Sequence, residues 1–195
     1  MPNEPVLVHA CCAPCLCGLL EPLRARNAPF TVLFHNFNIH PLIEFRRRLK
    51  ACHVLADREH LQFVAHEDYG LESFLDAIAT DHAPPQRCRH CYAGRLEAAA
   101  RHAAQHGFPV FTTTLLVSPQ QDREAICQLG HDAAERHGVA FDDTDHRSRH
   151  APGLEIARRL QLYRQQYCGC IFSEWERYRD TTRHLYRPQD NAVAP

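Results

Sequence analysis

His9-Ala10-Cys11-Cys12-Ala13-Pro14-Cys15, with three cysteines in seven residues, follows directly on the apolar run Val6-Leu7-Val8. The apolar run predicts a buried strand, so the cysteines stand in the loop just beyond its end. Two adjacent cysteines can serve one metal centre only if the backbone turns sharply between them, which a coil followed by Pro14 allows. Because we find no signal sequence and cytosolic thiols stay reduced, we interpret the loop as metal-binding in preference to disulfide-forming. It needs further ligands, and two groups are available: Cys88-Arg89-His90-Cys91 and Cys168-Gly169-Cys170.

Composition indicates a cytoplasmic domain with a full core. The 195 residues are 45% hydrophobic, so we expect one domain over residues 1–187 and a disordered tail over residues 188–195. Ten cysteines are too many and too clustered for core filling, and in the reducing cytoplasm such cysteines bind metals or carry electrons. No apolar run approaches the roughly 18 residues of a membrane span. The formal charge of -1 argues against a protein that coats nucleic acid and leaves room for a local basic face.

Strand and helix signals alternate along the chain. Short β-branched or aromatic runs predict strands at residues 6–8, 31–34, 61–64, 110–113 and 139–141. Apolar residues that recur every three or four positions predict helices at residues 17–26, 41–59, 71–79, 88–106, 122–137, 154–160 and 173–183. The alternation implies right-handed crossovers and an α/β fold, a doubly wound, mainly parallel sheet of the Rossmann-like, HUP-like kind with a helical C-terminal extension.

The expected fold also predicts where a ligand binds. In doubly wound sheets the site lies beyond the carboxyl ends of the strands, where the strand order reverses. Cys11 and Cys12 follow the first predicted strand and Thr113-Thr114-Leu115 follows the fourth, so both belong to this edge. The first loop lacks the glycines with which a phosphate-binding loop approaches its ligand, and this argues against a nucleoside triphosphate.

Four cysteines form the candidate metal centre. Cys11, Cys12, Cys88 and Cys91 offer enough thiolates for a cubane iron–sulfur cluster or for tetrahedral zinc. Cys88 and Cys91, at the start of a predicted helix, share one face of its first turn. Structural zinc is the main alternative, although zinc usually stabilises domains too small to fold alone. Cys15 is a candidate further ligand, to the cluster or to an adjacent ion.

Cys168-Gly169-Cys170 forms a separate group. A disulfide across one residue departs from the preferred torsion, and strained disulfides are labile, which fits a catalytic dithiol that cycles. The alternative is that both thiols bind the same metal. Tyr163, Arg164 and Tyr167 stand beside the pair. Aromatic rings and guanidinium planes stack on splayed nucleobases, so these three are candidate substrate-binding residues.

Other cysteines and a basic run have simpler interpretations. Cys17, Cys52 and Cys127 match no motif, and we expect them to pack in the core. We expect the run Arg46-Arg47-Arg48 on the solvated face of its helix, with contact to phosphates as the alternative.

Five motifs occur in order along the chain: His9-Ala10-Cys11-Cys12-Ala13-Pro14-Cys15; Asn38-Ile39-His40-Pro41; Arg87-Cys88-Arg89-His90-Cys91-Tyr92 with Arg95-Leu96; Thr113-Thr114-Leu115-Leu116 with Ser118-Pro119; and Tyr163-Arg164-Gln165-Gln166-Tyr167-Cys168-Gly169-Cys170-Ile171-Phe172-Ser173. Together they resemble the epoxyqueuosine reductases of the QueH type, and the resemblance extends from Val6 to Ser173. The chain departs from that family at Phe37, where proline is usual. Cys15 stands where some members have aspartate, and both side chains can bind iron.

The resemblance implies an enzyme that reduces the epoxide of epoxyqueuosine in tRNA to the cyclopentene of queuosine, without cobalamin. The residues it implies are Cys11, Cys12, Cys88 and Cys91 as ligands of a [4Fe-4S] cluster, Cys168 and Cys170 as a redox-active pair, and Cys15 as a candidate ligand of an additional iron ion. A cubane passes one electron at a time and a dithiol releases two, so we interpret the pair as the reservoir and the cluster as the conduit, with an unidentified electron donor. The alternatives are a general thiol–disulfide oxidoreductase and a zinc-stabilised RNA-binding module.

Overall fold

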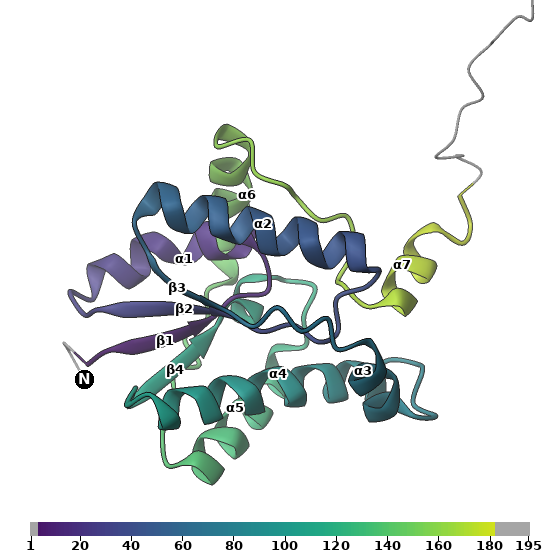
Figure 1. Cartoon of the computed structure of the whole chain (residues 1–195), viewed down its shortest axis with the longest axis horizontal. Helices are drawn as coiled ribbons and strands as arrows, with labels where there is room; N and C mark the ends of the chain where they lie inside the picture. Colours follow the sequence, from purple (N-terminus) through teal and green to yellow (C-terminus); the bar gives the residue numbers. More distant parts are fainter. Residues whose placement is uncertain (1–3, 182–195) are drawn as a thin grey trace, which may run out of the picture.

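Five parallel strands form the centre of the fold in the computed structural model, which describes residues 4–181 (Figure 1). The strands are β1 (Val6–His9), β2 (Phe30–Phe34), β3 (Gln62–Ala65), β4 (Val110–Thr113) and β5 (Ala140–Phe141). Their order across the sheet is β3-β2-β1-β4-β5, and every neighbouring pair is parallel. The predicted doubly wound α/β sheet is therefore confirmed. The end of the expected domain, residues 182–187, and the tail expected at 188–195 lie outside the described residues.

Helices cover both faces of the sheet. α1 (Ala13–Ala25), α2 (Leu42–Glu59) and α6 (His150–Arg159) lie on one face, and α3 (Leu71–Ile78), α4 (Gln86–Gln105) and α5 (Arg123–His137) lie on the other (Figure 1). Within these layers α1 packs on α6, and α4 packs on α5. The last helix, α7 (Ile171–Tyr178), lies beyond the carboxyl ends of the strands and forms the expected helical extension. Short 3-10 helices follow β4 (η1, Thr114–Val117) and precede α6 (η2, Arg147–Arg149).

The central strands are buried on both sides by these helix layers. Leu7 and Val8 of β1 are fully buried, as are Val32 and Leu33 of the neighbouring β2. A strand covered on both faces reads as a continuous apolar run, and this is why β1 is recognisable from its sequence. None of the helices in residues 4–181 is long and apolar enough to cross a membrane.

α1 begins at Ala13, earlier than the predicted start at residue 17. Proline is favoured in the first turn of a helix, where its missing N–H would have no partner in any case. Pro14 occupies that turn, so it opens the helix and does not prolong the coil. Cys12 is consequently the N-cap residue, and Cys15 lies in the first turn of the helix.

The arginine run of α2 divides between solvent and core. Arg46 and Arg47 are exposed as expected, but Arg48 is only 2% exposed, so the prediction of a solvated face is wrong for this residue. Residues four apart share a face of a helix, and Glu44 lies on the inward side with Arg48. The two form a buried ion pair in which Arg48 Nε lies 2.7 Å from Glu44 Oε1.

Three cysteines outside the motifs have the expected packing roles. Cys17 and Cys52 are buried in the main core, and Cys127 is half-buried and packs against it. The cysteines within the motifs therefore remain the candidates for metal binding and redox chemistry.

Candidate functional site

The strand order reverses between β1 and β4, and the carboxyl ends of these strands form the candidate site. His9 ends β1 and Thr113 ends β4, with Nδ1 of the ring 2.8 Å from Oγ1 of the threonine. The other ring nitrogen, Nε2, lies 3.0 Å from the carbonyl oxygen of His35, which follows β2. A carbonyl can only accept, so Nε2 carries the proton and Thr113 donates to Nδ1. Burial lowers the pKa of His9 to about 3, so the ring stays neutral and connects β1 to both neighbouring strands.

Cys11, Cys12 and Cys15 bring their sulfur atoms within 4.8 Å of one another just beyond β1. All three side chains are buried. The backbone bends at Cys11, as expected, and Cys12 follows as the extended N-cap residue. The first turn of the helix then returns Cys15 to the same place. Within residues 4–181, this is the one group of His, Cys, Asp or Glu side chains that is close enough to hold a metal ion.

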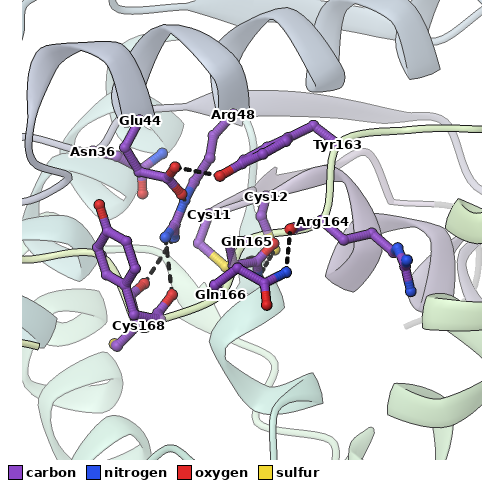
Figure 2. A network of polar contacts seen from close by, with 12 residues as sticks. Cys11, Cys12, Asn36, Glu44, Arg48, Tyr163, Arg164, Gln165, Gln166 and Cys168 are labelled. Carbon is purple, nitrogen blue, oxygen red and sulfur yellow. Dashed lines mark hydrogen bonds and ion pairs between the residues drawn. The ribbon is translucent and has the colours of Figure 1, made fainter. Parts of the chain in front are cut away.

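Polar groups from two other segments donate to these sulfurs. Thr114, at the start of η1, accepts a hydrogen bond from the Cys11 N–H at 2.9 Å and donates its hydroxyl to Cys11 Sγ at 3.2 Å. Gln165 Nε2 lies 3.0 Å from Cys12 Sγ (Figure 2). Donors directed at sulfur stabilise a thiolate, and such bonds orient and tune the ligands of metal–thiolate centres.

The grouped thiols have very unequal acidities. Hydrogen bonds from Cys12 and Cys15, with smaller contributions from the charge of Arg95 and from the Thr114 hydroxyl, hold the pKa of Cys11 well below its usual value. The hydrogen bonds to Cys11, together with burial, raise the pKa of Cys12 and of Cys15. Cys11 is therefore the most acidic thiol of the group, and the other two thiols are directed at its sulfur. Because a metal requires thiolate ligands, metal binding at this group releases protons.

The α4 cysteines approach the same edge and lie outside that group. Cys91 is buried, and Arg95 Nη2 lies 2.8 Å from its sulfur. Arg95 also donates to Asn36 Oδ1 at 3.5 Å, and Asn36 Nδ2 donates to the carbonyl of Ala10 at 2.9 Å. This chain of bonds connects Cys91 to the residue that precedes the first cysteine of the loop. Cys88 is half-buried, and neither α4 cysteine joins the 4.8 Å group.

The Cys168 and Cys170 thiols lie on a loop that enters the site just before α7. Arg48 donates from Nη1 to the carbonyl of Cys168 at 2.7 Å and from Nη2 to that of Tyr167 at 2.9 Å (Figure 2). Cys168 is exposed, whereas Cys170 is buried and forms the N-cap of α7. Burial raises the pKa of Cys91 to about 12, and Cys168 and Cys170 lie close enough to Cys91 to interact with it electrostatically.

Gly169, between the two redox candidates, is closely packed. Its carbonyl accepts the His40 N–H at 2.8 Å, and its own N–H donates to Ser173 Oγ at 3.1 Å. Its φ of +157° is one that residues with side chains rarely adopt, and a Cβ here would lie 3.3 Å from Ile39 Cγ1. Only glycine fits without a shift of its neighbours.

The predicted substrate-binding residues divide into two kinds. Tyr163 donates its hydroxyl to Glu44, and Tyr167 donates to the carbonyl of His40 at 2.7 Å. These bonds fix both hydroxyl groups and leave the rings half-buried. Arg164 is exposed, and its side chain extends away from the cysteines (Figure 2).

Arg48, Arg95 and Gln165 are among the residues that bond the site without having had a predicted role in it. Arg95 and Gln165 stand within the motif stretches, which is the one sequence signal that could have indicated them. Arg48 carried no such signal, because an arginine beside two others on a helix is typical of a solvated face.

The side chains of the site fit a thiolate-bound metal centre. The 4.8 Å group consists of sulfur ligands without carboxylate or imidazole, and neighbouring hydroxyl and amide groups donate to its sulfurs. Thiolates suit iron–sulfur clusters and zinc, whereas magnesium and calcium take oxygen ligands.

The chain matches the family described as "Epoxyqueuosine reductase QueH" over residues 6–176. A relative of that name from Dehalococcoides mccartyi is 34% identical, over 89% of this chain and 94% of the relative. Those from Histophilus somni and Haemophilus influenzae are each 36% identical, over 93% and 88% of this chain and 75% and 72% of the relatives. A solved chain described as a predicted subunit of tRNA methyltransferase, from Methanocaldococcus jannaschii, has a TM-score of 0.47 at 12% identity over 77% of this chain and 76% of its own, too loose a likeness to support a conclusion. The match over residues 6–176 and these relatives show that the chain belongs to the epoxyqueuosine reductase QueH family.

Proposed function

We propose that this chain is an oxidoreductase that reduces epoxyqueuosine to queuosine in tRNA, the last step of queuosine biosynthesis, without cobalamin. Membership of the QueH family supports the activity. The structural observation that carries the proposal is the buried group of Cys11, Cys12 and Cys15 at the reversal point of the sheet.

The proposed cofactor is a [4Fe-4S] cluster held by Cys11, Cys12, Cys88 and Cys91, with Cys15 as ligand of an additional iron ion. When bound, iron would supply one-electron transfer and a Lewis acid for the epoxide oxygen. Thr114 and Gln165 would donate to ligand sulfurs, through the bonds that they make to Cys11 and Cys12. These bonds would orient the ligands and stabilise their negative charge.

The Cys168 and Cys170 pair would supply the electrons and protons that the reaction consumes. Conversion of the epoxide to an alkene breaks both bonds to the epoxide oxygen, which leaves as water. The conversion consumes two electrons and two protons. Oxidation of the two thiols to a disulfide forms one S–S bond and supplies both electrons and both protons. An electron donor that has not been identified must then reduce the disulfide before the next turnover.

The surrounding residues would hold this loop through its main chain. Arg48 and His40 bond main-chain atoms of the loop, so neither occupies a sulfur. Tyr163 and Tyr167 would present ring faces to the modified base, and Arg164 would contact RNA outside the cysteine site.

A zinc-stabilised RNA-binding module is the second candidate. The sulfur atoms of Cys11 and Cys12 are 3.7 Å apart. That separation is close to the edge of a tetrahedron with zinc–sulfur bonds near 2.3 Å, which is roughly 3.8 Å. Such a protein would bind RNA and would leave the epoxide intact.

The test uses anaerobically purified full-length protein and tRNA that carries epoxyqueuosine. We expect a broad brown absorption that bleaches with dithionite, iron and sulfide in the preparation, and product nucleosides lighter by one oxygen atom in mass spectrometry. Colourless protein that contains zinc and leaves the epoxide intact would overturn the proposal. Disulfide reduction in unrelated proteins, without loss of the epoxide, would instead identify a general thiol–disulfide oxidoreductase.

A further inference from the structure

A groove of about 690 Å³ lies between the start of α2, the segment that precedes Cys168, and α7. A second hollow, of about 360 Å³, follows α2, and the two share Ile43, Arg47 and Tyr163 in their walls. We call this continuous surface the α2–α7 groove. It reaches Tyr167, the residue next to Cys168, so it leads directly to the candidate site.

The α7 end of the groove is aromatic. Trp175 is 58% exposed and Tyr178 is 40% exposed, although both are large apolar side chains. The ring of Tyr178 packs edge to face with Tyr167, with centroids 6.4 Å apart. The Arg179 guanidinium lies 4.9 Å from the centre of the Trp175 ring. Neighbouring aromatic rings that are open to solvent form stacking platforms for unpaired nucleobases.

The α2 end of the groove is basic. Arg46, Arg47 and Lys50 line the second hollow and are exposed. Within residues 4–181, none of the three takes part in an ion pair. The Arg47 guanidinium lies 5.7 Å from the centre of the Tyr163 ring, so the basic and aromatic parts meet there. Cations without acidic partners are available to phosphates.

Two acidic side chains also line the groove. Glu44 is 3% exposed and paired with Arg48, so it presents little charge to a ligand. Glu174 belongs to α7, at the aromatic end, where bases and not phosphates would lie. The groove therefore has cations at its α2 end and exposed aromatic rings at its α7 end. This arrangement is complementary to a ligand with phosphates on one side and bases on the other.

We propose that the α2–α7 groove binds unpaired nucleotides that flank the substrate nucleoside. Their bases stack on Trp175 and Tyr178, and their phosphates lie against Arg46, Arg47 and Lys50. The inference rests on the proposed function and adds to it the surface that holds the neighbouring RNA. It also explains how a chain with a net charge of -1 binds RNA, because the basic face is local.

The chain contains a built-in reporter for this groove, because Trp175 is its single tryptophan. The experiment titrates the full-length protein with an unmodified anticodon stem–loop RNA and records both tryptophan emission and the anisotropy of labelled RNA. We expect the RNA to quench the emission over the same concentration range in which anisotropy rises. Trp175→Ala should weaken binding by roughly 5- to 150-fold, the measured range for loss of one stacked base. Trp175→Phe, which keeps a ring, should retain most of the affinity.

The basic end has its own variant and a matched control. Arg47→Ala should weaken binding and lower the slope of log affinity against log salt by about 0.7, the contribution of one phosphate on a single strand. Arg101→Ala removes an exposed arginine from α4, on the opposite face of the sheet, and should leave affinity and slope unchanged. Circular dichroism and metal content of each variant confirm that it is folded.

Three results would overturn the inference. The first is that RNA raises the anisotropy while Trp175 emission stays unchanged and Trp175→Ala binds with full affinity. In that case epoxide reduction would persist, and the proposed function would stand. The second is a shift of tryptophan emission with protein concentration in the absence of RNA, which would identify a second copy of the chain as the occupant. The third is the absence of both RNA binding and epoxide reduction, which would also remove the proposed function.

Discussion

The two cysteine groups of the site are held in contrasting ways. Cys11 and Cys12 follow a central strand. Their backbone is fixed by bonds of Ala10 to β2 and to Asn36 after it, and by the bond that the Cys11 N–H donates to Thr114 after β4. Cys168 and Cys170 stand outside the sheet, on a loop that depends on a buried guanidinium and on main-chain bonds to His40. The sheet and its neighbouring segments thus shape the first group. The second can change its contacts without disturbing the sheet, as a cycling dithiol must.

The difference also appears in exposure. Cys12 is 1% exposed and Cys15 is 5% exposed, whereas Cys168 is exposed and only its partner, Cys170, is buried. A buried thiol group excludes solvent from a metal centre, and an exposed thiol can meet an external reductant. Substitutions in the two regions should therefore have separable effects.

The largest expected effect is loss of the cofactor. Cys12→Ser or Cys91→Ser should lower iron content sharply and abolish epoxide reduction, because a serine hydroxyl is a poor replacement for a thiolate ligand. Cys127→Ser, a half-buried cysteine outside the motifs, is the control and should keep both iron and activity. Metal analysis and product mass spectrometry provide the measurements. Full iron in Cys91→Ser together with loss of iron in Cys127→Ser would contradict the ligand assignment.

Substitution in the second group should separate electron storage from metal binding. Cys170→Ser should keep iron and the visible spectrum but lose multiple turnover with a thiol donor, because the remaining thiol cannot close an intramolecular disulfide. Some turnover should survive with dithionite, which bypasses the thiol pair. Loss of iron in this variant, with no rescue by dithionite, would show that Cys168 and Cys170 are metal ligands and would remove the contrast between the two groups.

Arg48 tests what holds the second group in place. Arg48→Met leaves Glu44 buried without its partner and removes the donors to Tyr167 and Cys168, so the free energy of unfolding should fall by about 3–5 kcal/mol. Cys168 should also react faster with iodoacetamide. Arg46→Met, on the exposed side of the same helix, should change stability by less than about 0.5 kcal/mol. Urea unfolding and alkylation rates measure both effects, and equal losses in the two variants would refute the role of the buried guanidinium.

Much of the fold is predictable because its signals are local. The strand expected at residues 110–113 is β4, and the helix expected at 122–137 agrees with α5 to within one residue. The helix has strong periodicity and clear ends: Asp122 caps the start of α5 and Gly138 ends it. The start of α1 was missed because Pro14 is compatible with either a coil or a first helical turn.

The location of the site was predictable, whereas its bonding was not. Parallel strands place Cys11 and Thr114 at one edge whatever the details, and the structure brings the two into contact. Gln165 reaches Cys12 across 153 residues of sequence, and no local pattern reports such a contact. We predicted one centre from Cys11, Cys12 and the two cysteines of α4. In the structure the thiol nearest to Cys11 and Cys12 is that of Cys15, because α1 begins early enough to bring Cys15 back beside them.

The smallest expected effect is on the pH dependence of stability, through His40, whose main chain bonds the Cys168 loop. The His40 ring is buried between Tyr69 and Phe74, and burial lowers its pKa to about 4. In the unfolded chain the pKa is near 6.5, so between about pH 6.5 and pH 4 the unfolded state binds the extra proton. Stability present above pH 6.5 is therefore lost as the pH falls through this window, at up to about 1.4 kcal/mol per pH unit from this residue.

His40→Phe keeps an aromatic ring in that position and cannot take up the proton. Its main-chain bonds to Gly169 and Tyr167 remain available, so the Cys168 loop should stay in place. Urea unfolding from about pH 7.5 to about pH 4.5 should show a shallower loss of stability in the variant than in the wild type, by up to one proton in the linkage slope. Iron content should be equal in the two proteins, because neither nitrogen of the His40 ring has a hydrogen-bond partner within residues 4–181. Parallel pH profiles would show that His40 does not titrate between the two states, and loss of iron in the variant would show that the two groups are coupled and not separable.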